Sequence, residues 1–216
     1  MTARILANDR QLWLGSTQSG KTTAANYVCS QFACGGAVID VKGELRMAHA
    51  PTVRDVAQLE RELRRSRWVR YLPATNEADE FEDVYAALFR LRHRVVRTTE
   101  AYAVGSPRGL RLIQTQGAGL GLGHVAESQR PRNIDRTLMT EADHLFLMQK
   151  GLSADDLADV SKEFGISART VIAEIDRLEP YGFLWWDRRA RDLCAVAPFP
   201  PSYLAIAERF AKKRTV

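Results

Sequence analysis

An eight-residue segment near the amino terminus has the residue types and spacing needed to hold a polyphosphate. It reads GSTQSGKT and matches G-x-x-x-x-G-K-[ST] at every fixed position. Glycines let such a loop wrap closely around phosphates, and successive backbone N–H groups form a nest for the anion. The expected nucleotide contacts are Gly15, Ser16, Thr17, Gln18, Ser19, Gly20, Lys21, Thr22 and Thr23.

Two side chains of this segment have specific expected roles. Lys21 supplies a mobile positive charge for the β- and γ-phosphates, and the hydroxyl of Thr22 is expected to ligate Mg²⁺. The apolar stretch QLWL precedes the loop, and a helical pattern follows it, as in nucleotide-binding phosphate loops. ATP and Mg²⁺ are therefore the expected cofactors.

A phosphate cradle does not itself hydrolyse ATP, because a carboxylate must orient or activate the attacking water. Such a carboxylate normally lies at the end of a neighbouring strand. Glu100, which follows the stretch RVVRTT, is the best candidate, and Asp40 and Glu127 compete with it. A solvated glutamate at the start of a helix is the alternative interpretation of Glu100.

The elements that must position these residues alternate along the first 150 residues. Short apolar runs predict strands, and apolar residues at helical spacing predict helices between them. This alternation indicates an α/β fold, with a mostly parallel sheet covered by helices on both faces. The expected strands are 11–14, 37–41, 68–72, 121–128 and 144–149, with 94–104 extended; the expected helices are 20–32, 55–66, 78–93, 109–117 and 134–141.

The last third of the chain changes character. Residues 152–198 predict two helices separated by Gly165 and then a hairpin. These elements either close the ATPase sheet or form a small winged-helix-like module. We favour the first, because a core ending at residue 150 would lack its last strands. The expected organisation is a single domain over 1–201, followed by a basic tail over 202–216.

Composition narrows the class of protein. The chain has 216 residues, of which 45% are hydrophobic and 26% charged, as in globular domains. Three cysteines without a C-x-x-C motif argue against a disulfide scaffold, and scattered histidines argue against a zinc site. No run of 18 apolar residues predicts a membrane span, and no signal peptide is recognised. We expect a cytoplasmic location.

The formal net charge of +5 makes nucleic acid a candidate partner. Arginine clusters could contact phosphates without sequence preference. The alternative is a solvated helix face with ion pairs between neighbouring turns. The basic positions are Arg61, Arg64, Arg65, Arg67 and Arg70; Arg90, Arg92, Arg94 and Arg97; Arg188, Arg189 and Arg191; and Lys212, Lys213 and Arg214.

Three stretches resemble the FtsK–HerA superfamily of DNA-pumping P-loop ATPases. They are GSTQSGKTTAANYV at the phosphate loop, AVIDVKGEL (37–45), and GLGLGHVAESQRPRNIDRTLMTEADHLFLM (119–148). The resemblance covers about residues 10–150 well and 151–200 loosely. It implies a P-loop NTPase fold of the RecA/ASCE type.

The resemblance also assigns roles to single residues. Glu100 falls at the catalytic glutamate and Gln129 at the sensor of the γ-phosphate. The family has an aspartate before that glutamate as an outer-shell partner of Mg²⁺, whereas this chain has Thr99, whose hydroxyl could hold a metal-bound water without charge. Arg130 is a candidate for the arginine that completes a neighbouring subunit's site, together with Arg108 and Arg111.

The implied function is ATP-driven translocation of double-stranded DNA. A compact member of this size is similar to the genome-packaging ATPases of tailless icosahedral viruses with an internal membrane. Such motors form rings, usually hexamers, and capsid vertex proteins are expected partners; location at a packaging vertex of the virion would follow. The alternatives are a coupling or mobilisation ATPase of a conjugative element and an ATP-switched winged-helix DNA-binding regulator.

Overall fold

The computed structural model describes residues 4–213. Within this part of the chain, nine strands form one sheet in the order β10-β9-β8-β1-β7-β6-β2-β5-β4, and β11 pairs with β3. The strands are β1 (Arg10–Leu14), β2 (Gly36–Ile39), β3 (Leu45–Arg46), β4 (Thr52–Val53), β5 (Trp68–Tyr71), β6 (Val95–Thr98), β7 (Gly123–Ser128), β8 (His144–Met148), β9 (Phe183–Asp187), β10 (Asp192–Val196) and β11 (Lys212–Lys213).

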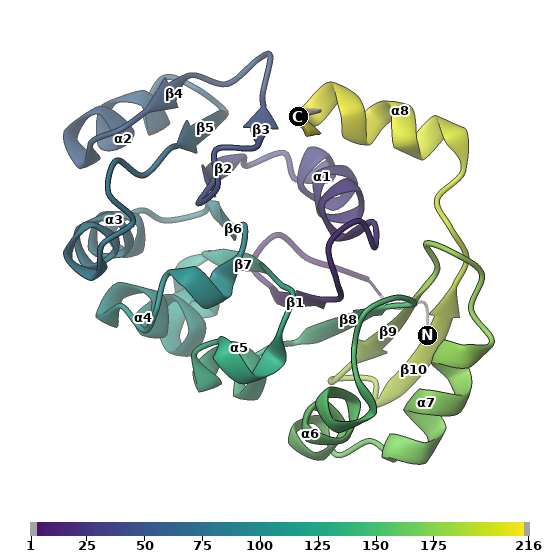
Figure 1. Ribbon diagram of the computed structural model, residues 1–216. Coiled ribbons are helices and arrows are strands. Elements are labelled where there is room, and N and C mark those ends of the chain that lie inside the picture. Colours follow the sequence, from purple (N-terminus) through teal and green to yellow (C-terminus); the bar gives the residue numbers. More distant parts are fainter. Residues whose placement is uncertain (1–3, 214–216) are drawn as a thin grey trace.

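Helices connect the parallel strands and cover the sheet (Figure 1). Every helix among residues 4–213 is too short or too polar to cross a bilayer. The α-helices are α1 (Lys21–Gln31), α2 (Val56–Leu63), α3 (Ala78–Arg90), α4 (Arg108–Gln116), α5 (Arg136–Thr140), α6 (Ala154–Phe164), α7 (Ala168–Asp176) and α8 (Pro201–Phe210); 3-10 turns span Ala101–Ala103, Gly117–Leu120 and Pro131–Asn133.

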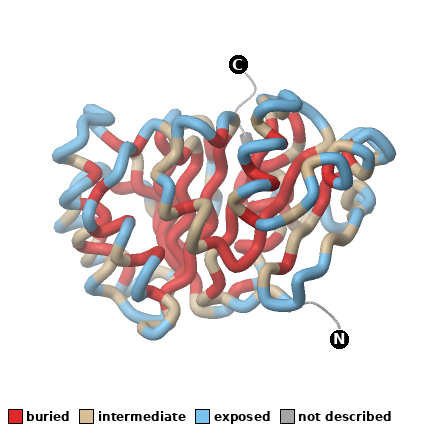
Figure 2. The backbone as a smooth tube through the Cα atoms, turned by 90° about the horizontal axis from the view of Figure 1, so that it is seen from below, coloured by how far each residue is buried: buried red, intermediate tan, exposed pale blue. Residues whose placement is uncertain are grey.

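Side chains that alternate along the strands feed two separate cores. Leu12 and Leu14 of β1 belong to the core beneath helices α2 to α7, whereas Trp13 belongs to the core beneath α1 and α8. All three side chains are fully buried. Figure 2 shows the same arrangement as a buried central layer between two partly exposed ones. The prediction of a mostly parallel sheet covered on both faces is confirmed.

The position of β1 decides where the chemistry lies. β1 pairs in parallel with both β7 and β8, and β6 lies next to β7. Parallel strands bring their carboxyl ends to one edge of the sheet. The segments that follow β1, β2, β6 and β7 therefore meet there, in agreement with the expected ATPase core.

The last third of the chain continues the same sheet. β9 is antiparallel to β8, and β10 is antiparallel to β9. The hairpin that could have been a wing is thus hydrogen-bonded to the strand that precedes it. Helices α6 and α7 pack into the core beneath α2 to α5.

Much of the expected basic tail is a folded element. α8 lies along α1 (Figure 1), where Tyr203 stacks on Tyr27 with ring centroids 4.4 Å apart. Asn26 of α1 donates a 2.6 Å hydrogen bond to the carbonyl of Ala211, just after α8. Arg214, one of the expected basic positions, lies outside the described residues.

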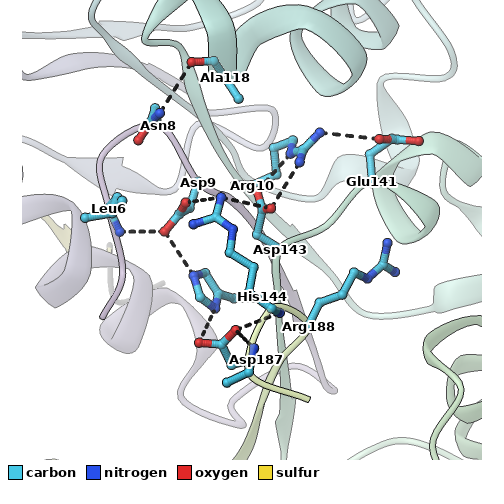
Figure 3. Close-up of polar contacts among 12 residues, drawn as sticks. Leu6, Asn8, Asp9, Arg10, Ala118, Glu141, Asp143, His144, Asp187 and Arg188 are labelled. Atoms are coloured by element: carbon cyan, nitrogen blue, oxygen red, sulfur yellow. Dashed lines mark hydrogen bonds and ion pairs between the residues drawn. The ribbon is translucent and has the colours of Figure 1, made fainter. Parts of the chain in front are cut away.

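The amino edge of the sheet holds a network of ion pairs (Figure 3). Asp143 accepts hydrogen bonds from the Nε of Arg10 at 2.9 Å and from Arg189 at 3.1 Å. Asp9 accepts a 3.0 Å hydrogen bond from His144 and lies 2.8 Å from Arg189. These contacts tie the starts of β1 and β8 to the turn after β9.

Candidate nucleotide-binding and catalytic site

The phosphate loop connects β1 to α1 at the carboxyl edge of the sheet. Gly20 has φ +97°, in the left-handed region that favours glycine. At Gly15 a side chain would lie 2.6 Å from the Cβ of Met148, so only glycine fits against β8. The two glycines of the motif are therefore required by the backbone path itself.

A cleft of about 360 Å³ lies beside this loop. The ammonium of Lys21 donates to the carbonyls of Gly15 at 2.6 Å and Ser16 at 2.8 Å, which holds it inside the loop. The expected contacts Thr17, Gln18, Ser19, Gly20, Lys21, Thr22 and Thr23 line the cleft, whereas Gly15 and Ser16 lie behind it. The loop and helix start form the anion cradle expected of the motif.

Glu100 lines the same cleft, immediately after β6. Its Oε1 accepts a hydrogen bond from Lys42 and another from Gln129, each at 2.8 Å. Its Oε2 is buried and has no hydrogen-bond partner among the described residues. A buried acceptor left unpaired in a cleft can receive a proton from a water bound there.

Gln129 connects Glu100 to the phosphate loop. Its amide nitrogen donates to Glu100, while its Oε1 accepts a 3.0 Å hydrogen bond from the hydroxyl of Thr17. The structure thus brings together the expected general base, the expected sensor and the loop. A phosphate group that displaces Thr17 would change the contacts of Glu100 through this amide.

Lys42 is a site residue that sequence reasoning missed. Its burial would lower the pKa, but the hydrogen bond and negative charge of Glu100 raise it above the ordinary value for lysine. The ammonium is therefore held in its charged form beside the carboxylate. Lys42 lies in the stretch AVIDVKGEL, the signal that could have pointed to it.

The other carboxylate candidates differ in their surroundings. Asp40 is buried and paired with Arg70 at 2.6 Å, and it also accepts hydrogen bonds from the backbone of Glu44 and Leu45. These contacts close the turn after β2. Glu127, on β7, accepts a 2.9 Å hydrogen bond from the hydroxyl of Thr22.

Thr99 lines the cleft, whereas Arg130 does not. The hydroxyl of Thr99 donates to the carbonyl of Ile39 at 3.2 Å and accepts from the N–H of Val41 at 3.1 Å, so it links β6 to β2. Arg130 follows Gln129 directly, but it is exposed and does not line the cleft. A role for Arg130 would therefore concern the neighbouring molecule rather than its own cleft.

Aromatic residues from the carboxyl-terminal third also line the cleft, and Tyr181 lies close to Gly20 of the phosphate loop. Tyr181 is 63% exposed, an unusual fraction for an aromatic side chain beside a binding loop. Neighbouring segments from β9 and the start of α8 complete an apolar wall suited to a nucleobase. The residues of this wall belong to no sequence motif, so no motif pointed to it. They are Tyr181, Phe183, Pro198, Phe199 and Leu204.

The donor set suits a magnesium ion held together with nucleotide phosphates. No three histidine, cysteine, aspartate or glutamate side chains within residues 4–213 converge as a metal site of their own. Mg²⁺ bound with nucleotides needs only one or two protein ligands besides phosphates and water. The hydroxyl of Thr22, next to the carboxylate of Glu127, meets that requirement.

Two of the arginines predicted to contact DNA are buried inside the molecule, which corrects that expectation for them. Arg70 and Arg97 are buried in ion pairs with Asp40 and Glu127. Arg94 and Arg188 are half-buried and donate to backbone carbonyls. Arg67 and Arg189 are exposed, although Arg67 also donates to a backbone carbonyl and Arg189 joins the amino-edge network. The exposed members of the three arginine clusters include Arg61, Arg64, Arg65, Arg92 and Arg191.

Solved structures with the same fold include viral packaging enzymes. The genome packaging NTPase B204 from Sulfolobus turreted icosahedral virus 2, in complex with sulfate, is 17% identical, covers 91% of this chain and 99% of its own, and gives a TM-score of 0.75. The DNA-packaging ATPase B204 from Sulfolobus turreted icosahedral virus is 15% identical, covers 91% and 100%, and gives 0.69.

A bacterial protein shares the fold more distantly. EssC (ATPases 2 and 3) from Geobacillus thermodenitrificans is 14% identical, covers 96% of this chain and 44% of its own, and gives a TM-score of 0.57. No family model and no curated protein matches the sequence. At sequence identities this low, the comparisons establish a shared fold and nothing further. The chain shares with these ATPases a mixed α/β fold with a mostly parallel sheet, as its sequence predicted.

Proposed function

We propose that this protein is a Mg²⁺-dependent ATPase that translocates double-stranded DNA as a viral genome-packaging motor. The observation that carries the proposal is the arrangement of Glu100 and Gln129. One oxygen of Glu100 is held by Lys42 and Gln129, and the other is buried in the cleft without a partner. This geometry supports a general base that is connected to the phosphate loop.

ATP binds with its phosphates in the loop and its base against the wall that contains Tyr181. Lys21 leaves the carbonyls of Gly15 and Ser16 for the phosphate oxygens, a short movement for a flexible side chain. Thr22 would hold the magnesium ion that accompanies ATP, and this ion would supply positive charge to the phosphates. Thr99 is too firmly engaged with β2 to be more than a distant contributor.

Glu100 accepts the proton of the attacking water through its free oxygen. Positive charge from Lys21 stabilises the negative charge that develops on the γ-phosphoryl group. Gln129, which contacts both Thr17 and Glu100, exchanges partners when the γ-phosphate leaves. Since Arg130 follows it directly, this exchange can reach an adjoining subunit.

The motor is a ring of identical subunits, which we expect to be a hexamer, with ATP bound at each boundary. Arg130 reaches into the neighbour's cleft and completes its site. Mixing Arg130→Ala subunits with Glu100→Gln subunits tests this assignment. Activity should return in the mixture, because some boundaries then combine an intact Glu100 with an intact Arg130; no recovery would place Arg130 outside catalysis.

The nucleic-acid partner is supported by the exposed arginines and by the fold. The likeness to the packaging enzymes covers nine-tenths of this chain and nearly all of theirs, so it extends to the carboxyl-terminal third. A packaging role implies work in the host cell at a capsid vertex, in contact with vertex proteins. A conjugative coupling ATPase and an ATP-switched DNA-binding regulator are the other outcomes that the following experiment distinguishes.

The test is steady-state ATP hydrolysis with and without long double-stranded DNA. Wild type should turn over ATP, and DNA should accelerate it in proportion to DNA length until saturation. Glu100→Gln should lower turnover by at least about a hundredfold while ATP still binds, and Lys21→Ala should lose both. The matched control is Glu60→Gln, whose carboxylate pairs with Arg90 on the molecular surface.

The outcomes separate the candidate functions. An ATP turnover rate that does not change when DNA is added would contradict the proposal of a DNA-translocating motor. ATP binding without turnover, together with tight binding to one DNA sequence, would favour the regulator. DNA-stimulated turnover that needs single-stranded ends rather than duplex length would favour the coupling ATPase.

A further inference from the structure

The position before Glu100 lacks a carboxylate. The resemblance places an aspartate there as a partner of Mg²⁺, but the residue is Thr99. Its hydroxyl proton goes to the carbonyl of Ile39, and one of its lone pairs accepts from Val41. Thr99 therefore has one lone pair left and brings no negative charge to a metal on the cleft side.

A buried carboxylate lies one strand away. Glu127 of β7 lines the cleft and is only 3% exposed. Its Oε2 accepts a 2.9 Å hydrogen bond from the Oγ1 of Thr22. A threonine hydroxyl has one proton, so donating it to Glu127 leaves the lone pairs of Oγ1 directed away from the carboxylate, where a cation can bind.

Arg97 offsets the free-energy cost of burying the carboxylate of Glu127. The Nε of Arg97 donates to the Oε1 of Glu127 at 2.8 Å, and the arginine is completely buried. The same guanidinium donates to the side chain of Asn26 and, at 3.4 Å, to the carbonyl of Thr22. Arg97 therefore fixes Glu127 against the first turn of α1, with one oxygen balanced and the other facing Thr22.

We propose that Glu127 has taken over the role of the missing aspartate, so that the carboxylate that prepares Thr22 for magnesium comes from the sensor strand β7 instead of β6. The inference rests on the proposed function, because it concerns the Mg²⁺ that accompanies ATP. Glu127 is a positioning residue that acts through Thr22. Gln129, two residues later, senses the phosphate. The residue that positions the metal ligand and the residue that senses the phosphate therefore lie on β7 and directly after it.

The test measures the affinity for a mant-labelled ATP analogue in Mg²⁺ and again in EDTA. Wild type should bind more tightly in Mg²⁺, and the ratio of the two dissociation constants gives the magnesium-dependent gain. Glu127→Gln should reduce that gain by about tenfold or more, as loss of a residue behind a metal ligand does, and leave the affinity in EDTA within twofold. Thr99→Val should retain the gain, as should the surface control Glu60→Gln.

Glu127→Gln leaves Arg97 buried without its partner and could unfold the protein. The double variant Glu127→Gln/Arg97→Gln removes both charges and keeps hydrogen-bonding groups at both positions. It should fold, as judged by circular dichroism and the urea midpoint, and it should still lack the gain. A gain retained by a folded Glu127 variant overturns the proposal and makes the pair purely structural; a gain lost in Thr99→Val overturns it as well, whatever the Glu127 variants do.

The result also distinguishes this inference from the proposed function. If wild type binds no nucleotide in either condition, the ATPase proposal fails. If wild type shows the gain and the folded Glu127 variants keep it, only the assignment of Glu127 fails.

Discussion

Both edges of the sheet contain buried charged groups, but the groups at the two edges have different surroundings. At the amino edge, Asp143 accepts hydrogen bonds from Arg10 and Arg189. Asp9 accepts one from His144 (Figure 3). At the carboxyl edge, Glu100 has one oxygen paired and one buried without a partner, beside a cleft. Burial of charge alone thus does not mark the site.

The comparison shows what separates a structural network from a reactive one. At the amino edge the buried carboxylates form ion pairs with Arg10 and Arg189, whereas at the carboxyl edge Glu100 has one oxygen with neither a hydrogen bond nor an ion pair among the described residues. Lys42 and Gln129 each hold Glu100 through one hydrogen bond. The following predictions test this difference, from the largest expected effect to the smallest.

Asp143→Asn should destabilise the protein and leave nucleotide binding intact. Removing the carboxylate charge of Asp143 leaves Arg10 with only its longer ion pair to Glu141, and the free energy of unfolding should fall by about 3 kcal/mol. Urea denaturation measures this, and mant-ATP titration of the folded protein should give the wild-type affinity. Lys21→Ala should show the reverse pattern; a stability loss as large as that of Asp143→Asn would erase the distinction between the edges.

Acid should weaken the fold through His124. His124 on β7 is fully buried, and burial lowers its pKa to about 3. The unfolded chain binds a proton below about pH 6.5 and the native state does not, so stability falls as pH drops. Between pH 7 and pH 5 this residue should cost about 2 kcal/mol of unfolding free energy. His124→Gln should remove that part of the pH dependence; an unchanged slope would contradict the assignment.

Lys42→Met should raise basal ATP hydrolysis in the absence of DNA. The variant releases one hold on Glu100, whose ion pair is partly exposed and worth about 1 kcal/mol, so the rate should rise about fivefold. Lys42→Arg keeps the charge and should keep the low basal rate. A fall in the rate of Lys42→Met would mean that the lysine orients Glu100 for catalysis and does not restrain it.

Tyr181→Ala should weaken ATP binding by about fivefold, because loss of one stacking surface costs about 1 kcal/mol. The same factor is expected for GTP, since the apolar wall stacks on either base. Tyr181→Phe should retain the affinity. Equal affinities for the wild type and Tyr181→Ala would show that Tyr181, from the carboxyl-terminal third, does not contribute to nucleotide binding.

Local patterns were enough to predict most of the sheet and its helices. The phosphate loop follows an apolar strand and precedes a helix, and α3 begins with Asp79 and Glu80 and ends with Arg90, as helix ends favour. The two-residue strands β3, β4 and β11 were not predicted, because so short a run carries no periodic signal. The docking of α8 on α1 depends on Tyr27 and Tyr203, which are far apart in the chain.

The candidate site was predicted in part for the same reason. Glu100 and Gln129 follow strands whose order the motif implies, so their meeting could be foreseen. The contacts of Lys42 with Glu100 and of Thr22 with Glu127 join residues 58 and 105 positions apart. Only the register of the sheet decides which of these side chains face each other, and a single sequence does not contain that register.

The central place of β1 has a consequence for how the protein is made. Arg10 binds Asp143, 133 residues later, and β1 lies between two strands from that later part of the chain. At a synthesis rate of about 5–20 residues per second, Leu12, Trp13 and Leu14 wait roughly 6 to 23 seconds before their partners on β7 are made. During translation the strand that carries the phosphate loop is therefore an exposed apolar segment, and chaperone binding to nascent chains should concentrate there.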